Sequence, residues 1–344
     1  MTTIALVGID LGKRTFHVHA QDAAGWQVLR RQMNRVQLVR WLAQLPPCTV
    51  AFEACCGAHW LGWKLHEFGH TPRMIDARRV RPFVAGNKHD FADAQAICEA
   101  ARRPAIRSIA PKTPEQLALA SLHRIRDARV AERTACINQT HAFLLEFGMG
   151  MAGSKAMMRA LPDIAEDGSN RLPSASRRML MAQYEHYQYL CARLDELDRQ
   201  IQERLQDDEL AVRLQEVPGI GPITASAVCA EAAQARQCAS SRDFAASIGL
   251  TPRQHSTGGK ASMLGITKRG DGNLRRLLVQ CARVLLMRKD QREDAMVQWA
   301  RRLSSRRHTN VVACALAAKL ARILWAILVR GQRYQPHPVA ATGN

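Results

Sequence analysis

The chain has 344 residues, enough for two or three domains, and a formal net charge of +19, which favours a polyanionic partner such as nucleic acid. Its ten cysteines include no C-x-x-C pair, which argues against a zinc finger or zinc ribbon and fits a reducing cytoplasm. Neither an 18-residue apolar run nor a signal-peptide pattern occurs, so we expect no membrane-spanning helix and a cytoplasmic location.

Residues 1–110 alternate strand and helix patterns and predict an α/β catalytic domain. The expected strands cover 4–9, 15–20, 26–33, 49–53 and 71–75, and the expected helices cover 36–45 and 60–68. Three successive strands followed by alternating helices and strands favour a sheet of ribonuclease-H type.

Four acidic residues of this domain occupy positions that suit a metal site. Asp10 and Glu53 each end an apolar strand, and Asp90 and Asp93 are spaced i, i+3, which places both on one face of a helix. Carboxylates at strand ends can converge at the rim of a sheet, and oxygen-only clusters suit Mg²⁺ or Mn²⁺. An acidic metal site in a cationic protein is typical of chemistry on a nucleic-acid backbone.

Residues 111–210 predict a linker of long helices. The first helix begins at Thr113-Pro114-Glu115 and runs to about Phe147, the stretch 154–175 is expected to be irregular, and a second helix spans 176–209. The second helix carries a coiled-coil seam of Leu180, Tyr184, Tyr187, Cys191, Leu194, Leu197, Ile201 and Leu205. Two arrangements stay open and can coexist: an antiparallel hairpin with the first helix, or a contact between two chains.

Residues 211–331 predict a helical C-terminal domain. Within it, Val217-Pro218-Gly219-Ile220-Gly221-Pro222 joins two helical segments. This pattern is typical of a helix-hairpin-helix unit, in which Gly219 and Gly221 let backbone N–H groups approach a phosphate. The alternative is a tight turn that joins two packed helices.

Residues 249–276 form a second candidate site, in which Ser256 and Thr257 precede Gly258-Gly259 in a loop with few apolar residues. A hydroxyl among cations can attack a phosphodiester, and His255 or a metal-bound water could take its proton. The alternative is a loop that grips phosphate without chemistry. The residues expected to contact nucleic acid are Gly219, Gly221, Arg253, His255, Thr257, Lys260, Lys268, Arg269, Arg275 and Arg276.

The last quarter of the chain is its most basic part. Residues 251–344 carry a net charge of +14, against +7 for residues 1–110 and −2 for residues 111–250, so much of the surface facing a nucleic-acid backbone is expected there. Three helices are expected over 272–288, 290–303 and 309–329, and the last is apolar on nearly all sides, as in a buried core helix. Residues 332–344 predict a flexible tail.

An ordered set of motifs resembles one family, the insertion-sequence-110-type transposases with their relatives, the Piv-type DNA invertases. The residues that carry the resemblance are Gly8-Ile9-Asp10, Phe52-Glu53-Ala54, the stretch from Lys88 to Ala94, Pro218-Gly219-Ile220-Gly221, the stretch from Phe244 to Lys260, and Lys268-Arg269-Gly270-Asp271. The run Gln254-His255-Ser256-Thr257-Gly258-Gly259-Lys260 is similar to the insertion-sequence-1111 branch.

The resemblance implies a RuvC-like N-terminal domain, a coiled-coil linker and a C-terminal transposase domain. It implies that the tetrad Asp10, Glu53, Asp90 and Asp93 binds metal, and that a serine forms a covalent 5′-phosphoserine link to DNA. It also implies a bridge guide RNA that pairs with donor and target DNA, and a homo-oligomer, either a dimer or a tetramer, acting at the bacterial nucleoid.

The position of the serine nucleophile depends on a one-residue gap. Either Ser256 or Thr257 aligns with the family's serine, and Ser256 is preferred because a primary hydroxyl is less hindered.

Three other functions fit parts of the sequence. A RuvC-type junction endonuclease would need the four acids without Ser256 or a covalent intermediate. An actin-like ATPase or sugar kinase fits Gly8-Ile9-Asp10-Leu11-Gly12, yet Lys13 and Arg14 replace its usual small residues and no clear second phosphate loop occurs. A non-catalytic protein would bind nucleic acid without metal-dependent strand exchange.

Overall fold

The structure is a computed structural model that describes residues 3–87, 89–206, 208–287 and 294–336. The chain divides into two compact units. The first comprises Met1–Thr113 with Ala233–Cys238, and the second comprises Pro114–Ala232 with Ala239–Asn344. Each unit is described by itself.

The first unit is built on a five-stranded mixed sheet with the order β3-β2-β1-β4-β5. β1 is antiparallel to β2 and parallel to β4, while β2 and β3 are antiparallel and β4 and β5 are parallel. The strands are β1 (Leu6–Leu11), β2 (Thr15–Gln21), β3 (Gln27–Asn34), β4 (Thr49–Glu53) and β5 (Thr71–Ile75). All five expected strands are thus confirmed, although β1 begins later than expected and extends past Asp10.

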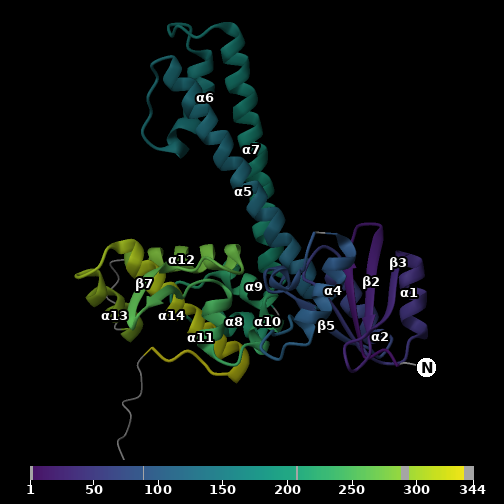
Figure 1. Cartoon of the computed structure of the whole chain (residues 1–344). Helices are drawn as coiled ribbons and strands as arrows, with labels where there is room; N and C mark the ends of the chain where they lie inside the picture. Colours follow the sequence, from purple (N-terminus) through teal and green to yellow (C-terminus); the bar gives the residue numbers. More distant parts are fainter. Residues whose placement is uncertain (1–2, 88, 207, 288–293, 337–344) are drawn as a thin grey trace, which may run out of the picture. The chain divides into compact units, whose positions relative to one another are not determined.

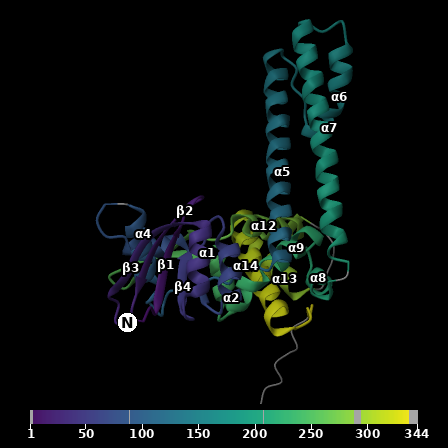
Figure 2. The same cartoon turned by 90° about the vertical axis from the view of Figure 1, so that its right-hand side faces the viewer.

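Helices cover both faces of this sheet (Figures 1 and 2). On one face, α1 (Arg35–Gln44) and α2 (Ala58–Glu67) pack on alternate strand residues such as Val7, Ile9 and Phe52. On the other face, α4 (Asp90–Ala101) packs on Leu6 and Ala51. The short helices α3 (Ala77–Val80) and η1 (Arg81–Phe83) precede α4, and α10 (Ala232–Gln237) lies almost entirely within this unit.

In the second unit, α5 (Pro114–Glu146) and α7 (Ser174–Glu203) run side by side as a long helical hairpin (Figures 1 and 2). The hairpin within one chain is confirmed, and a contact between chains stays a prediction. Buried residues of α7 include Leu180, Leu194 and Ile201 of the expected seam.

Two expectations for this region are wrong. The stretch 154–175 is not irregular throughout, because α6 (Ser154–Glu166) forms there and buries Met157, Met158 and Leu161 against α5 and α7. The second long helix ends at Glu203, not at 209, because Asp208 caps a new helix by accepting hydrogen bonds from the N–H groups of Leu210 and Ala211.

The rest of the second unit is helical apart from one β-hairpin. Its elements are α8 (Glu209–Gln215), α9 (Pro222–Ala230), α11 (Ser241–Ser247), β6 (Pro252–Thr257), β7 (Lys260–Ile266), α12 (Gly272–Met287), α13 (Ala295–Ser304) and α14 (Thr309–Arg330). The three expected closing helices are confirmed, except that residues 288 and 290–293 lie outside the described residues.

α14 is the one described helix that is long and apolar enough to cross a membrane by length and composition. It packs against α8, α11, α12 and α13, and buries ten residues including Leu316, Leu320 and Leu324. A helix enclosed in this way is the core helix that the sequence predicts.

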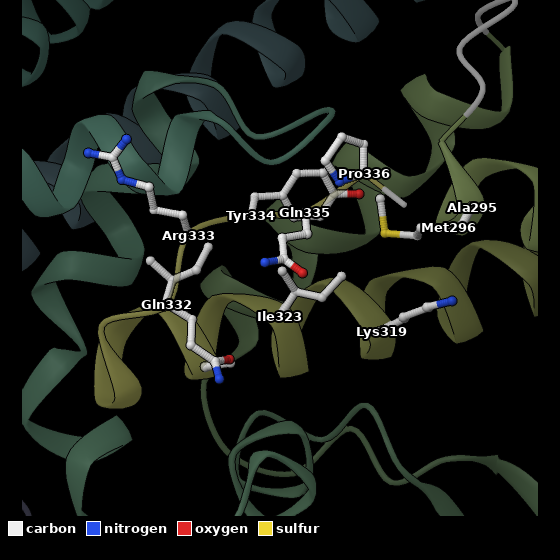
Figure 3. A pocket seen from close by; sticks show the side chains of 11 residues that line it. Ala295, Met296, Lys319, Ile323, Gln332, Arg333, Tyr334, Gln335 and Pro336 are labelled. Atoms are coloured by element: carbon white, nitrogen blue, oxygen red, sulfur yellow. The ribbon is translucent and has the colours of Figure 1, made fainter. Parts of the chain in front are cut away.

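The segment after α14 packs back onto the unit instead of fraying as expected. The Tyr334 hydroxyl donates to Asp294 Oδ2 at 2.5 Å, and Ala295 N donates to the Pro336 carbonyl at 3.1 Å. Asp294 also caps α13 and is 4% exposed. The segment walls a cavity of about 580 Å³ together with Met296, Lys319 and Ile323 (Figure 3). Residues 337–344 of the expected tail lie outside the described residues.

Candidate functional site

Asp10 and Glu53 lie at adjacent positions on neighbouring parallel strands. Ile9 of β1 pairs with Phe52 of β4, and each acid follows its partner in that register. Because strand side chains alternate between the two faces, both acids project away from the core that holds Ile9 and Phe52 and toward the face covered by α4. The register therefore gives the strand-end convergence that the sequence predicts.

Gly8 lets α4 approach this face closely. A Cβ built at Gly8 would lie 2.3 Å from the Ala94 carbonyl oxygen and 2.7 Å from Cys98 Sγ, so any side chain there would displace the helix. Ala94 lies one turn after Asp90, which begins the helix after the His89 cap. Asp90 and Asp93 both lie in the first turn, where the positive end of the helix dipole favours carboxylates.

Among the described residues, Asp10, His17 and Asp90 form a cluster that could hold a metal ion, since their potential ligand atoms lie within 4.8 Å of one another. His17 Nδ1 is 4.0 Å from Asp10 Oδ2 and 3.5 Å from Asp90 Oδ2. His17 faces Asp10 because these two residues pair directly across β1 and β2. Glu53 and Asp93, the other two predicted ligands, are outside this three-residue cluster.

The His17 ring is held from a second side by an aromatic residue. The Phe91 ring meets it edge-on with centroids 4.7 Å apart, and the Arg30 guanidinium lies 4.3 Å from the Phe91 centroid. Sequence reasoning missed His17. The signal was the tight β1–β2 connection, which sets Asp10 opposite His17 once the register is counted back from the turn.

The donor set of this cluster fits a divalent cation. Two carboxylates from different elements face one imidazole nitrogen, and the side chains are 26% (Asp10), 11% (His17) and 65% (Asp90) exposed. The site is therefore partly enclosed yet open on the Asp90 side, which leaves room for water or a substrate oxygen beside a bound ion.

The thiol of Cys55 lies near the two strand-end acids, Asp10 and Glu53, and their charges affect its pKa. Partial desolvation raises the pKa of its thiol to about 11, and the negative charges of Glu53 and Asp10 add to the shift. The side chains of Cys55 and Cys56 are both exposed, so neither belongs to the hydrophobic core. At neutral pH Cys55 is a protonated thiol and not a nucleophile.

Replacing Glu53 with glutamine should lower the pKa of Cys55, because one of the two nearby negative charges is removed. In a Cys56→Ser background, iodoacetamide should label Cys55 slowly at pH 8, and Glu53→Gln should raise the rate severalfold. Labelling is measured by mass spectrometry across pH 7–11. Glu67→Gln, which removes an exposed carboxylate paired with Lys64, is the control. Equal labelling rates in the two variants would show that the charge of Glu53 does not act on the Cys55 thiol.

The second candidate site is a β-hairpin and not the expected loop. β6 and β7 pair antiparallel through Ser256 with Ala261 and Thr257 with Lys260, and Gly258 and Gly259 form the turn with φ of +56° and +79°. Both turn residues have positive φ, as a two-residue hairpin turn of type I′ requires. Every residue of β6 is exposed.

Strand alternation decides which groups share a face with Ser256. Gln254 Nε2 donates to Ser256 Oγ at 2.9 Å across two residues. His255 is the adjacent residue and so faces the opposite side of the hairpin, together with Thr257. Within this hairpin, His255 is therefore not positioned as a general base for Ser256.

The base of the hairpin is tightly packed. Thr267 N donates to the Thr251 carbonyl at 2.9 Å, and Lys268 N donates to the Gly249 carbonyl at 3.1 Å. A Cβ at Gly270 would lie 1.6 Å from the Ser247 carbonyl oxygen, and one at Gly249 would lie 2.3 Å from the Arg269 carbonyl oxygen. Both glycines have φ of +73°, so the hairpin leaves the unit at a fixed point.

Gly270→Ala should destabilise the second unit by about 2–4 kcal/mol, because the new methyl group adds overpacking to an unfavourable positive φ. Gly258→Ala is a matched control, since Gly258 also has a positive φ but no atom lies within 4 Å of its added Cβ. Its cost should be only about 1 kcal/mol. Urea denaturation followed by circular dichroism compares the two, and equal midpoints would refute the close approach.

Two of the predicted nucleic-acid contacts are used inside the protein. Arg275 Nη1 donates to the carbonyls of Ile248 and Arg269, each at 3.0 Å, and so joins the two sides of the hairpin base. Arg276 pairs with Asp127 and donates to Asn273 Oδ1 at 2.8 Å. The other predicted cations, Arg253, Lys260, Lys268 and Arg269, are exposed around the hairpin.

Gly219 and Gly221 have different surroundings in the connection between α8 and α9. Gly219 has φ of +79°, and an added Cβ would lie 2.7 Å from Leu285 Cγ of α12. Close packing against Leu285 therefore explains why residue 219 is a glycine, as expected for a tight turn that joins two packed helices. Gly221 caps α9 with no atom near its added Cβ, which leaves the N-terminus of α9 accessible.

Comparison with known proteins finds two matched regions, one containing the acidic cluster and the other containing the Ser256 hairpin. Residues 7–149 match the family model of DEDD-type IS110 proteins, described as "Transposase", and residues 211–298 match the "Transposase IS116/IS110/IS902 family". The chain is 48% identical over 331 residues to the transposase for insertion sequence element IS1328 of Yersinia enterocolitica, which covers 96% of this chain and 98% of that protein. The chain belongs to the IS110 family of transposases.

A second relative of the IS110-family chain is the transposase for insertion sequence element IS1111A of Coxiella burnetii. The two are 36% identical over 337 residues, covering 97% of this chain and 92% of the relative. The four predicted acids fall in the first matched region, and Gly219, Gly221 and the Ser256 hairpin fall in the second. Each candidate site of this IS110-family chain thus lies in a region that its family shares.

Proposed function

We propose that this IS110-family chain is a site-specific DNA recombinase of an insertion sequence, which cuts and rejoins DNA through a covalent link to Ser256. The observation that carries the proposal is the meeting of Asp10 and Asp90. These acids come from a strand and a helix 80 residues apart and face one histidine nitrogen at the edge of the sheet. Two carboxylates held this close repel each other, and a bound cation would offset that repulsion.

The first unit acts as a RuvC-like domain of the ribonuclease-H class. Support comes from the strand order β3-β2-β1-β4-β5, with β1 parallel to β4, and from acids at the ends of both these strands. Asp10 and Asp90 would hold Mg²⁺ or Mn²⁺, and Glu53 and Asp93 complete the tetrad when substrate is bound. The ion would polarise the scissile phosphate and offset negative charge that develops on it.

Ser256 is the nucleophile in this proposal. Its Oγ forms a bond to phosphorus as the bond from phosphorus to the 3′-oxygen breaks, and the proton lost by the serine appears on the released 3′-hydroxyl. A 3′-hydroxyl of the exchanged strand then attacks the phosphoserine, reforms the DNA backbone and restores the serine. Phosphodiester bonds are conserved, so no ATP is consumed. Thr257 is the alternative nucleophile, and lies on the opposite face of the hairpin.

Sequence choice is assigned to a bridge RNA that pairs with donor and target DNA. The chain would contact backbones through exposed cations near the hairpin, such as Arg253 and Lys260, and through Gly221 at the N-terminus of α9, as in a helix-hairpin-helix unit. We assign residues 1–110 to the metal-binding catalytic domain, residues 111–210 to the helical linker and residues 211–331 to the C-terminal transposase domain. The protein would act at the bacterial nucleoid as a homodimer or homotetramer, with the α5–α7 hairpin as a contact between chains.

Reconstitution tests this proposal. Purified full-length protein, the RNA encoded by its own element, and supercoiled donor and target DNA are combined with Mg²⁺ or Mn²⁺. Recombinant junctions should form only with RNA and metal, and without ATP. The main alternative is a RuvC-type endonuclease without a covalent intermediate. Cleavage without RNA that leaves free ends and no joined product would favour that alternative.

A further inference from the structure

His17 has an unusual position for a histidine that merely supports the fold. The same ring atom, Nδ1, faces Asp10 Oδ2 at 4.0 Å and Asp90 Oδ2 at 3.5 Å. Its side chain is only 11% exposed. A histidine that only makes a hydrogen bond needs one acceptor for Nδ1. Here Nδ1 faces two carboxylate oxygens, which is the position that a third ligand of a shared metal ion would occupy.

The ring orientation is fixed by elements that do not depend on an ion. β2 lies between β1 and β3 in the sheet, and His17 pairs with Asp10 on one side and with Gln32 on the other, so two neighbouring strands fix the position of its backbone. Phe91 packs against the ring edge-on, and Arg30 packs over Phe91. A ligand held in this way is preorganised, which lowers the entropy lost when metal binds.

We infer that His17 Nδ1 is a ligand of the metal site and that it makes this site favour Mn²⁺ over Mg²⁺. The inference rests on the proposed function, because it concerns the metal of that same site. Mg²⁺ strongly prefers oxygen ligands, whereas an imidazole nitrogen favours first-row transition ions. Of the two ions that the acids suggest, Mn²⁺ alone belongs to that series.

The matched variants are His17→Asn and His89→Asn. The first replaces the nitrogen donor with an amide oxygen of similar reach, and so leaves an all-oxygen site. The second alters the histidine next to Asp90, whose Nδ1 accepts the Ala92 N–H at the start of α4. Asparagine is also a good N-cap, so α4 should keep its start.

The experiment measures the metal directly in the full-length protein without DNA. Electron spin echo envelope modulation of bound Mn²⁺ detects a coordinated ¹⁴N nucleus. The ¹⁴N signal should be present in the wild type and in His89→Asn, and absent in His17→Asn. Competition with Mg²⁺ should show the preference for Mn²⁺ falling roughly 10–100-fold in His17→Asn only.

Selective ¹⁵N labelling of histidine in the wild type gives a test that does not depend on a variant folding. The ¹⁴N modulation should be replaced by ¹⁵N coupling. Bound Mn²⁺ that requires Asp10 but shows no nitrogen coupling would overturn the inference and leave the proposed function standing. Mn²⁺ binding that is unchanged in Asp10→Asn would overturn both, because no metal would then be held by the tetrad.

Discussion

Asp10→Asn is expected to abolish DNA strand cleavage while leaving the protein at least as stable as the wild type. Asp10 and Asp90 converge on His17 Nδ1, and both carboxylates would bind the metal. Removing the charge of one ligand should cost several kcal/mol of transition-state stabilisation, which is a loss of roughly 10²–10⁴-fold in the cleavage rate. Without metal, the same change relieves repulsion between acids, so stability should not fall.

The opposite effects on stability and activity make this prediction sharp. Thermal midpoints are measured without metal, and cleavage rates are measured with saturating Mn²⁺. Asp76→Asn is the control, because Asp76 caps the short helix α3 of the same unit and lies outside the acidic cluster. It should lose a little stability and keep full activity. A cleavage rate in Asp10→Asn within threefold of the wild type would remove Asp10 from the reaction.

Ser256→Ala is expected to abolish both strand exchange and the covalent intermediate, with a loss of about 10⁴-fold or more. Ser256 is exposed on β6, and its described partner is Gln254, so the alanine variant should fold normally. Rates are measured in the reconstituted reaction, and binding of DNA and RNA is measured separately by gel shift. Binding should be unchanged, because alanine removes a hydroxyl and no charge.

Thr257→Ala is the matched control for this prediction. Thr257 is also exposed and adjacent in sequence, but strand alternation turns it to the other face of the hairpin. It should retain strand exchange within about tenfold of the wild type, since it loses at most a backbone contact. Activity that survives in Ser256→Ala and is lost in Thr257→Ala would move the nucleophile to Thr257.

The acidic site was predictable from sequence as far as local pattern reaches. Asp10 and Glu53 end apolar strands, and Asp90 and Asp93 share a helical turn, so both pairs follow from periodicity alone. His17 depends on the register between two strands, which no periodicity reports. The close packing that delivers Asp90 depends on Gly8, whose role is visible only once α4 lies over β1.

The second unit departs further from expectation, for identifiable reasons. The hairpin at Ser256 is exposed on β6, so it lacks the apolar alternation that marks a half-buried strand. α6 was missed because Pro162 lies inside it and glycines precede it. Arg275 was expected to contact nucleic acid because of its charge. Charge alone does not reveal that its guanidinium instead donates hydrogen bonds to two nearby carbonyls.

The most direct test of the central claim is the chemical identity of the residue joined to DNA. A DNA substrate whose cleaved strand carries a nick a few nucleotides to the 5′ side of the cleavage position should trap the intermediate, because the short fragment that ends in the released 3′-hydroxyl then dissociates. After nuclease and protease digestion, mass spectrometry should find a nucleotide attached through its 5′-phosphate to Ser256, in the peptide that contains β6. This adduct should be absent in Ser256→Ala and in Asp10→Asn. Efficient cleavage with no protein–DNA adduct, or an adduct on any other residue, would contradict the account.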